Sequence, residues 1–199
     1  AALEGAEACI STASGMSAIL MMCMGLLKAG DHVLCSRSMF GSTIKLIGSD
    51  LAKFGVESSF LPQADATAWQ AAIKPNTKLL FAETPTNPLT EVCDIRALAD
   101  IAHNAGALLC VDNCFATPSL QRPMALGADT VMHSGTNYLD GQGRVMAGSF
   151  CASEARVTQT LLPVLKSGAM TLAPFNAGGV PHGLETLAHR TPPHYARRQ

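Results

Sequence analysis

The chain has 199 residues, of which 48% are apolar and 15% are charged, and its formal net charge is −1. This composition is typical of a compact α/β domain and excludes a disordered chain. The near-neutral charge gives no electrostatic basis for binding nucleic acid or an anionic membrane. The longest uncharged apolar run, residues 19–27, is too short to cross a bilayer, and the first residues are typical of a domain interior, with no visible leader.

Seven cysteines are scattered through the chain, without a CxxC pair or the Cys/His spacing of a metal site. Most of them lie in apolar or strand-like segments. Cys110 and Cys114 flank Asp112, but small buried thiols of a reduced protein explain this pattern better than a metal or redox centre does. We therefore expect a cytoplasmic protein without a metal site.

Short apolar runs alternate with segments of helical periodicity along most of the chain. Strands are expected at residues 7–10, 32–36, 56–61, 78–82, 107–111, 130–133 and 147–151, and helices at residues 15–28, 43–54, 67–73, 95–104 and 154–166. Strands that alternate with helices favour an α/β fold. The sequence predicts one mainly parallel seven-stranded sheet that lies between helices.

The end of the chain has a different character. From Gly178 onward, glycines and prolines indicate a loop-rich ending with a basic tip at Arg197 and Arg198, within which residues 183–190 fit one short helix. We therefore predict a large domain over residues 1–176 and a divergent tail over residues 177–199.

Polar residues follow four of the expected strands. They are Ser14 and Gly15, residues 83–87, Asp112 and Asn113, and residues 134–137. In open α/β sheets, ligands bind beyond the carboxyl ends of the strands. We therefore expect these four segments to meet in one ligand site.

Two motifs carry a resemblance to a known family. Residues 133–141 are His-Ser-Gly-Thr-Asn-Tyr-Leu-Asp-Gly, and residues 83–88 are Glu-Thr-Pro-Thr-Asn-Pro. Both resemble signatures of the transsulfuration family of pyridoxal-phosphate (PLP) enzymes, which includes cystathionine γ-synthase, methionine γ-lyase and O-succinylhomoserine sulfhydrylase. The resemblance runs from about residue 3 to residue 176, and Phe40 and residues 120–123 are most similar to the O-succinylhomoserine sulfhydrylase branch. It implies the large-domain fold of PLP-dependent transferases, as in aspartate aminotransferase.

The resemblance implies that two segments bind the phosphate of PLP. Ser14, Gly15 and Met16 match a turn that opens a helix, where free N–H groups favour an anion. Ser134 and Thr136 match hydroxyls that contact the same phosphate. Taken singly, these residues also fit an ordinary N-cap and ordinary turn positions.

Three further residues match groups around the cofactor ring. Asp112 matches the acid that pairs with the pyridine nitrogen, and Asn87 matches the amide that hydrogen-bonds the phenolic oxygen. Phe40 stands where many members have a tyrosine stacked on the ring, and it can stack but cannot exchange a proton. Taken alone, Asp112 could equally be an ordinary loop or N-cap aspartate, and Phe40 could equally be an ordinary core side chain.

Asn137 stands where the family has the lysine that forms the Schiff base with PLP. An amide nitrogen is not a usable nucleophile, so any PLP bound here is expected to be non-covalent. The six lysines lie in segments expected away from the four strand ends; they are Lys28, Lys45, Lys53, Lys74, Lys78 and Lys166. The family's upstream segment, which reaches a neighbouring subunit's site, and its C-terminal domain, with an arginine for the substrate carboxylate, have no counterpart here.

Two classes of function stay open at this stage. One is an enzyme of methionine biosynthesis whose catalysis is impaired because Asn137 replaces the lysine. It resembles the family members that replace the activated group of a homoserine with sulfide and so form homocysteine. The other is a non-catalytic protein that binds PLP or a PLP–amino-acid adduct, or assembles with active paralogues. An engineered change or a decayed gene product would give the same asparagine. The family further implies small amino-acid substrates and a homo-oligomer.

Overall fold

A seven-stranded sheet forms the centre of the protein, whose computed structural model describes residues 1–196, without the side chains of residues 194 and 195. Arg197 and Arg198, the expected basic tip, lie outside the described residues. The strand order is β1-β7-β6-β5-β4-β2-β3. The strands are β1 (Ala8–Thr12), β2 (His32–Ser36), β3 (Glu57–Leu61), β4 (Thr77–Glu83), β5 (Leu108–Asp112), β6 (Thr130–Ser134) and β7 (Gly148–Ala152).

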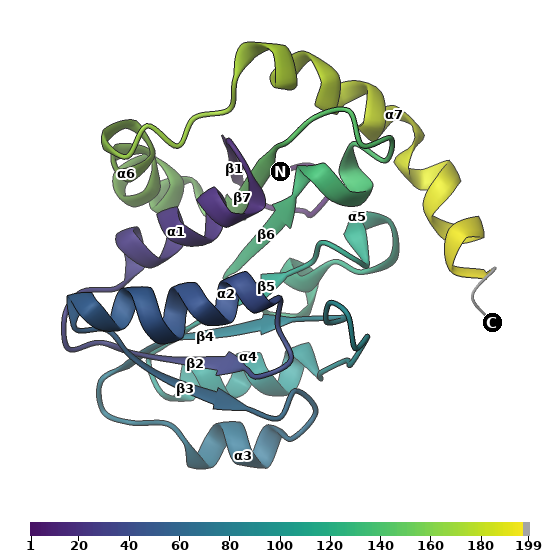
Figure 1. Cartoon of the computed structure of the whole chain (residues 1–199). Helices are drawn as coiled ribbons and strands as arrows, with labels where there is room; N and C mark the ends of the chain where they lie inside the picture. The colour runs from purple at the N-terminus through teal and green to yellow at the C-terminus, as the bar shows by residue number, and fades with distance from the viewer. Residues whose placement is uncertain (197–199) are drawn as a thin grey trace.

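The sheet is mainly parallel, which confirms the prediction. The pairs β2–β3, β2–β4, β4–β5 and β5–β6 are parallel, whereas β7 is antiparallel to both of its neighbours, β1 and β6. Six strands therefore point in one direction and β7 alone points in the other. As a result, the carboxyl ends of β1, β2, β4, β5 and β6 lie at the same edge of the sheet (Figure 1).

Helices cover both faces of the sheet, as Figure 1 shows. On one face lie α1 (Gly15–Leu26), α2 (Gly41–Lys45) with the helical turns η1 (Leu46–Asp50) and η2 (Leu51–Phe54), and η5 (Arg156–Leu161) with α6 (Leu162–Ser167). On the other lie α3 (Ala66–Ala71) and α4 (Ile95–Asn104). Alternate residues of β4 supply the two cores: Leu79 and Phe81 pack under α1, and Leu80 and Ala82 under α4.

Short helical segments after β5 and β6 complete the edge of the sheet. They are α5 (Thr117–Leu120), η3 (Pro123–Leu126) and the irregular turn η4 (Gly135–Leu139). The sequence patterns did not predict α5 or η3, because a single turn is too short to show a period of 3.6 residues.

The tail is a helix, so the prediction of a loop-rich ending was wrong. Helix α7 spans Pro174–Ala196, with Pro181, Pro192 and Pro193 inside it. Packing compensates for these poor helix formers: a Cβ on Gly183 would collide with the carbonyl oxygen of Leu139, so α7 lies directly on the end of η4. Within residues 1–196, no helix combines the length and apolar character needed to span a membrane.

Candidate functional site

A pocket of about 340 Å³ opens at the edge where the parallel strands end. All nine residues that the sequence singled out for the site line it, together with seven others. The lining residues are Ser14, Gly15, Met16, Ile19, Phe40, Thr43, Glu83, Asn87, Asp112, Cys114, Phe115, Met132, Ser134, Thr136, Asn137 and Met146. The four strand ends thus meet at one pocket, although Asn113, which follows Asp112, is not part of the lining.

One side of the pocket is the start of α1. Ser14 caps this helix, and its Oγ accepts a hydrogen bond of 3.1 Å from the backbone N–H of Ser17. A Cβ on Gly15 would lie 2.9 Å from Cβ of Ser134, so only glycine lets the helix approach the end of β6 this closely. The hydroxyls of Ser14, Ser134 and Thr136 therefore lie near a helix N-terminus, which is a favourable place for an anion.

The floor of the pocket carries a buried acid. Asp112 ends β5 and is 6% exposed, and its Oδ1 accepts a hydrogen bond of 3.0 Å from the backbone N–H of Cys114. Burial raises the pKa of the Asp112 carboxyl, while the contact with Cys114 and the charge of His133 act in the opposite direction. A cationic group bound against this carboxyl would favour its charged form.

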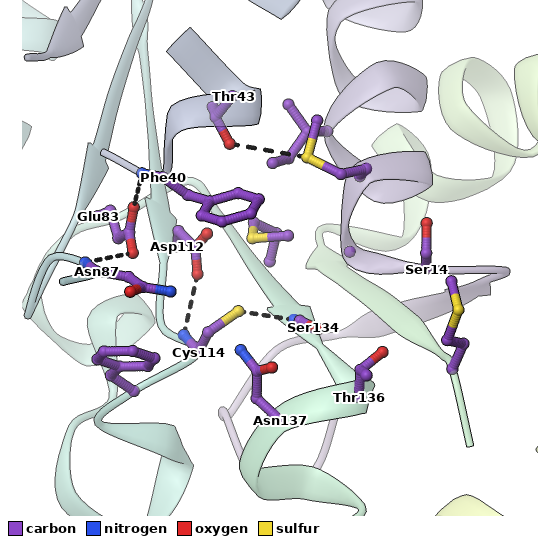
Figure 2. A pocket seen from close by; sticks show the side chains of 16 residues that line it. Ser14, Phe40, Thr43, Glu83, Asn87, Asp112, Cys114, Ser134, Thr136 and Asn137 are labelled. Carbon is purple, nitrogen blue, oxygen red and sulfur yellow. Dashed lines mark hydrogen bonds between the residues drawn. The ribbon is translucent and has the colours of Figure 1, made fainter. Parts of the chain in front are cut away.

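Glu83 also lines the pocket; it belongs to the segment 83–87 that was expected at the site, but the sequence gave it no role of its own. It ends β4 and is 3% exposed, and its two oxygens accept backbone N–H bonds of 2.7 Å from Phe40 and 2.8 Å from Asn87 (Figure 2). Burial, followed by the nearby Asp112, raises its pKa to about 8. The signal was present in the sequence, because Glu83 opens the Glu-Thr-Pro-Thr-Asn-Pro run.

Asn137 lies in the turn η4, and its side chain points towards the pocket (Figure 2). Its backbone angles, φ −84° and ψ −115°, interrupt the helical turn. The turn is fixed on both sides: Asp140 N donates to the carbonyl of Gly135 at 2.9 Å, and Gly141 N donates to that of Asn137 at 3.0 Å. Among the residues that line the pocket in the described chain, none is a lysine.

Cys114 joins the two strand ends that carry Asp112 and Ser134. Its Sγ accepts a hydrogen bond of 2.7 Å from the backbone N–H of Ser134. Burial raises the pKa of this thiol well above its usual range, so it is held as a neutral group. Cys114 is therefore a structural link between β5 and β6, which composition alone did not reveal.

A second polar network ties the same strand ends together on the other face of the sheet. Oε1 of Glu4 lies 2.7 Å from both Nδ2 of Asn113 and Nε2 of His133. Nε2 of Gln121 donates to the carbonyl of Thr84 and to Oδ1 of Asn113, each at 2.9 Å. In residues 1–196, no three His, Cys, Asp or Glu side chains are grouped as metal ligands would be.

Comparison with known proteins accounts for this arrangement. A family model described as "Cys/Met metabolism PLP-dependent enzyme" matches residues 1–197. The chain belongs to this family. The match includes the whole of α7, and membership implies pyridoxal phosphate as the cofactor.

Individual relatives agree with the family match. The chain is 55% identical over 196 residues to an O-succinylhomoserine sulfhydrylase of Pseudomonas aeruginosa, covering 98% of this chain and 48% of the relative. It is 41% identical to an L-methionine gamma-lyase of Pseudomonas putida, covering 100% and 50% respectively. The crystal structure of metB from Corynebacterium glutamicum superposes with a TM-score of 0.91 at 37% identity, covering 94% of this chain and 49% of that one. The chain thus spans about half the length of the curated relatives it matches.

The residues of the pocket suit PLP as a ligand. The volume of about 340 Å³ lies within the range of roughly 300–1,000 Å³ that is usual for small-molecule sites. The close approach at Gly15 forms a cradle beside the hydroxyls of Ser134 and Ser14, and the buried Asp112 offers an acid to a ring nitrogen. These features match the anionic and cationic ends of the cofactor.

Proposed function

We propose that this chain is the PLP-binding unit of a transsulfuration protein and that it binds PLP without a covalent bond. The observation that carries the proposal is the meeting of Asp112, Asn87 and Ser134 in one pocket that Asn137 lines in place of a lysine. PLP, when bound, supplies an electron sink for reactions at amino acids. Binding and orienting the cofactor would be the work of the chain's own residues.

The phosphate end of the cofactor has a counterpart at one side of the pocket. The start of α1 with Gly15 and the hydroxyls of Ser14, Ser134 and Thr136 would hold the phosphate. Met16, whose Sδ lies 3.9 Å from Oγ1 of Thr43, would pack beside it.

Around the ring, the proposed contacts come from three other strand ends. Asp112 would keep the pyridine nitrogen protonated, because a buried carboxylate favours a cation. Asn87 would hydrogen-bond the phenolic oxygen, and Phe40 would cover the ring face. Phe40 is 44% exposed, so this ring lies at the mouth of the pocket.

The reaction we propose for the whole protein follows its relatives: replacement of the activated group of a homoserine by sulfide, giving homocysteine for methionine synthesis. Asn137 would impair this reaction, because a lysine supplies both the nucleophile that bonds the cofactor and the base that moves a proton. Loss of general acid–base catalysis alone costs a factor of about 10²–10⁴ in rate.

A non-catalytic role is the second candidate, and the intact Asp112 and Asn87 beside Asn137 favour it. Such a protein would bind PLP or a PLP–amino-acid adduct, or assemble with active paralogues.

A homo-oligomer is also proposed, because Leu89 and Val92 are each 61% exposed on the loop that follows Asn87. All seven cysteines are unpaired, which supports a reducing compartment such as the cytoplasm.

Equilibrium dialysis with PLP tests the proposal. The protein should bind PLP more tightly than pyridoxal, which lacks the phosphate, and Asp112→Ala should weaken both. Equal affinity for the two compounds would contradict the phosphate site.

A second experiment separates the two candidate roles by measuring homocysteine formation from O-succinylhomoserine and sulfide. Turnover above the rate that PLP gives without the protein supports a residual enzyme.

A further inference from the structure

We propose that Glu83 is a positioning residue that fixes the backbone of Phe40 and Asn87 and thereby sets how the pocket recognises the phenolic-oxygen side of PLP. The inference rests on the proposed function. Glu83 lines the pocket, but both of its carboxyl oxygens are occupied by backbone N–H groups, so its effect on the ligand would pass through the two residues that it holds.

The carboxyl group of Glu83 joins two loops that are distant in the sequence. Phe40 follows β2, Asn87 follows β4, and each donates its backbone N–H to a different oxygen of the same carboxyl group. A glutamine would keep one acceptor but would turn an NH₂ group towards the other N–H. A carboxyl group, in contrast, carries lone pairs on both oxygens and can accept both bonds in this geometry.

Glu83 is itself held firmly. Its carbonyl accepts a hydrogen bond of 2.7 Å from Nε2 of Gln63, and it is the register partner of Asp112 across β4 and β5. The side chain is buried beside another carboxyl, where ionisation is costly. An acid kept in such surroundings needs a compensating role, and the two N–H bonds in the pocket wall supply one.

Glu91 provides a matched control within the same pair of loops. Its Oε2 accepts a hydrogen bond of 2.6 Å from Oγ of Ser38, so it also links the loop after β2 to the loop after β4. Unlike Glu83, Glu91 does not line the pocket and is exposed. A role in loop attachment alone would be shared by both glutamates, whereas a role in ligand recognition would belong to Glu83.

The experiment compares two ligands in the full chain. PLP and 3-deoxypyridoxal 5′-phosphate, which lacks the phenolic oxygen, are measured by equilibrium dialysis against wild type, Glu83→Gln, Glu91→Gln and Asn87→Ala. Wild type should prefer PLP by about tenfold, the effect of one good hydrogen bond. Glu83→Gln and Asn87→Ala should each lose this preference while binding the deoxy compound within about twofold of wild type, and Glu91→Gln should retain it.

The double variant Glu83→Gln/Asn87→Ala should show no loss of preference beyond the single variants, because both act on one contact. The inference is overturned if Glu83→Gln keeps the preference, or if both glutamate variants weaken both ligands equally. Should Glu83→Gln fail to fold, Glu83→Asp, which keeps the carboxyl group but shortens its reach, must lose the preference or the inference is wrong. Wild-type protein that binds neither ligand would overturn the proposed function as well.

Discussion

Glu83 and Asp112 lie opposite each other on the neighbouring strands β4 and β5, and both of their carboxyl groups are buried under the pocket. Burial raises the pKa of both carboxyl groups, and the charge of Asp112 raises the pKa of Glu83 further. The pocket therefore favours a ligand that brings a positive charge to Asp112. Protonation, stability and ligand binding are linked at this pair.

Stability should fall as the pH rises from about 5 to about 8. The pKa of Glu83 is raised from 4.5 to about 8, by burial first and by Asp112 second. An acid with a raised folded pKa binds its proton more tightly in the folded state, so its stabilising contribution is complete below the unfolded pKa and is lost as the pH passes the folded pKa. Thermal melts across this range should show a lower Tm at high pH and a shallower fall in Glu83→Gln. An equal dependence of Tm on pH in wild type and in Glu83→Gln would contradict the raised pKa of Glu83.

Asp112→Asn should stabilise the empty protein and weaken PLP binding. The amide retains an acceptor for the N–H of Cys114 but removes a buried acid whose pKa is raised by burial. At pH 8 we expect a gain of roughly 1–3 kcal/mol in unfolding free energy, the scale of an uncompensated buried polar group. Loss of the charged contact should lower PLP affinity by about tenfold or more. Denaturant melts and dialysis measure the two effects, and a destabilised variant with unchanged affinity would be inconsistent with this role.

Gly15→Ala should weaken binding of the phosphate group. The new methyl group would lie 2.9 Å from Cβ of Ser134, so the end of β6 or the start of α1 must shift. Affinity for PLP should fall about tenfold or more, while affinity for pyridoxal changes little. Gly41→Ala is the control, since nothing lies within 4 Å of a Cβ there. If both alanine variants bind PLP like wild type, Gly15 is not a cradle for phosphate.

Asn137→Lys should gain covalent PLP. The pocket already offers Asp112, Asn87 and Ser134 to the cofactor, and the substitution adds an amine at the position of the family lysine. An absorbance band of a protonated imine should appear, and borohydride should fix a pyridoxyl group on residue 137. Asn137→Gln, longer but without a nucleophile, is the matched control. A folded Asn137→Lys protein without the band in saturating PLP would mean that the site has a further defect.

Strand-level features of the site were predictable from the sequence. Short runs of four to six residues predicted the strands. Asp112 and Ser134 follow two of these runs directly and Ser14 follows another after a short gap, so the parallel topology brought them together. The direction of β7 was not predictable, because a buried strand has the same apolar pattern in either direction.

Other features depend on contacts between distant segments. Glu83 meets the backbone of Phe40, 43 residues earlier, and no local pattern reveals that bond. Helix α7 contains residues that disfavour helices, and it is stabilised by packing on η4 and by Arg190, whose Nη2 donates to the carbonyls of Leu139 and Gly183. Tertiary packing here outweighs local propensity. The division of the chain at residue 176 stays a prediction.

We propose that Asn137 leaves a pocket able to hold PLP but unable to bond it. An absorbance spectrum of the purified protein with PLP, recorded before and after gel filtration and borohydride treatment, is the sharpest test of this proposal. We expect the spectrum of the bound aldehyde or its hydrate, loss of PLP on filtration, and no pyridoxyl-lysine in a peptide map. A protonated-imine band that survives filtration, with a pyridoxyl group mapped to a lysine, or no PLP binding at saturation, would show that this proposal is wrong.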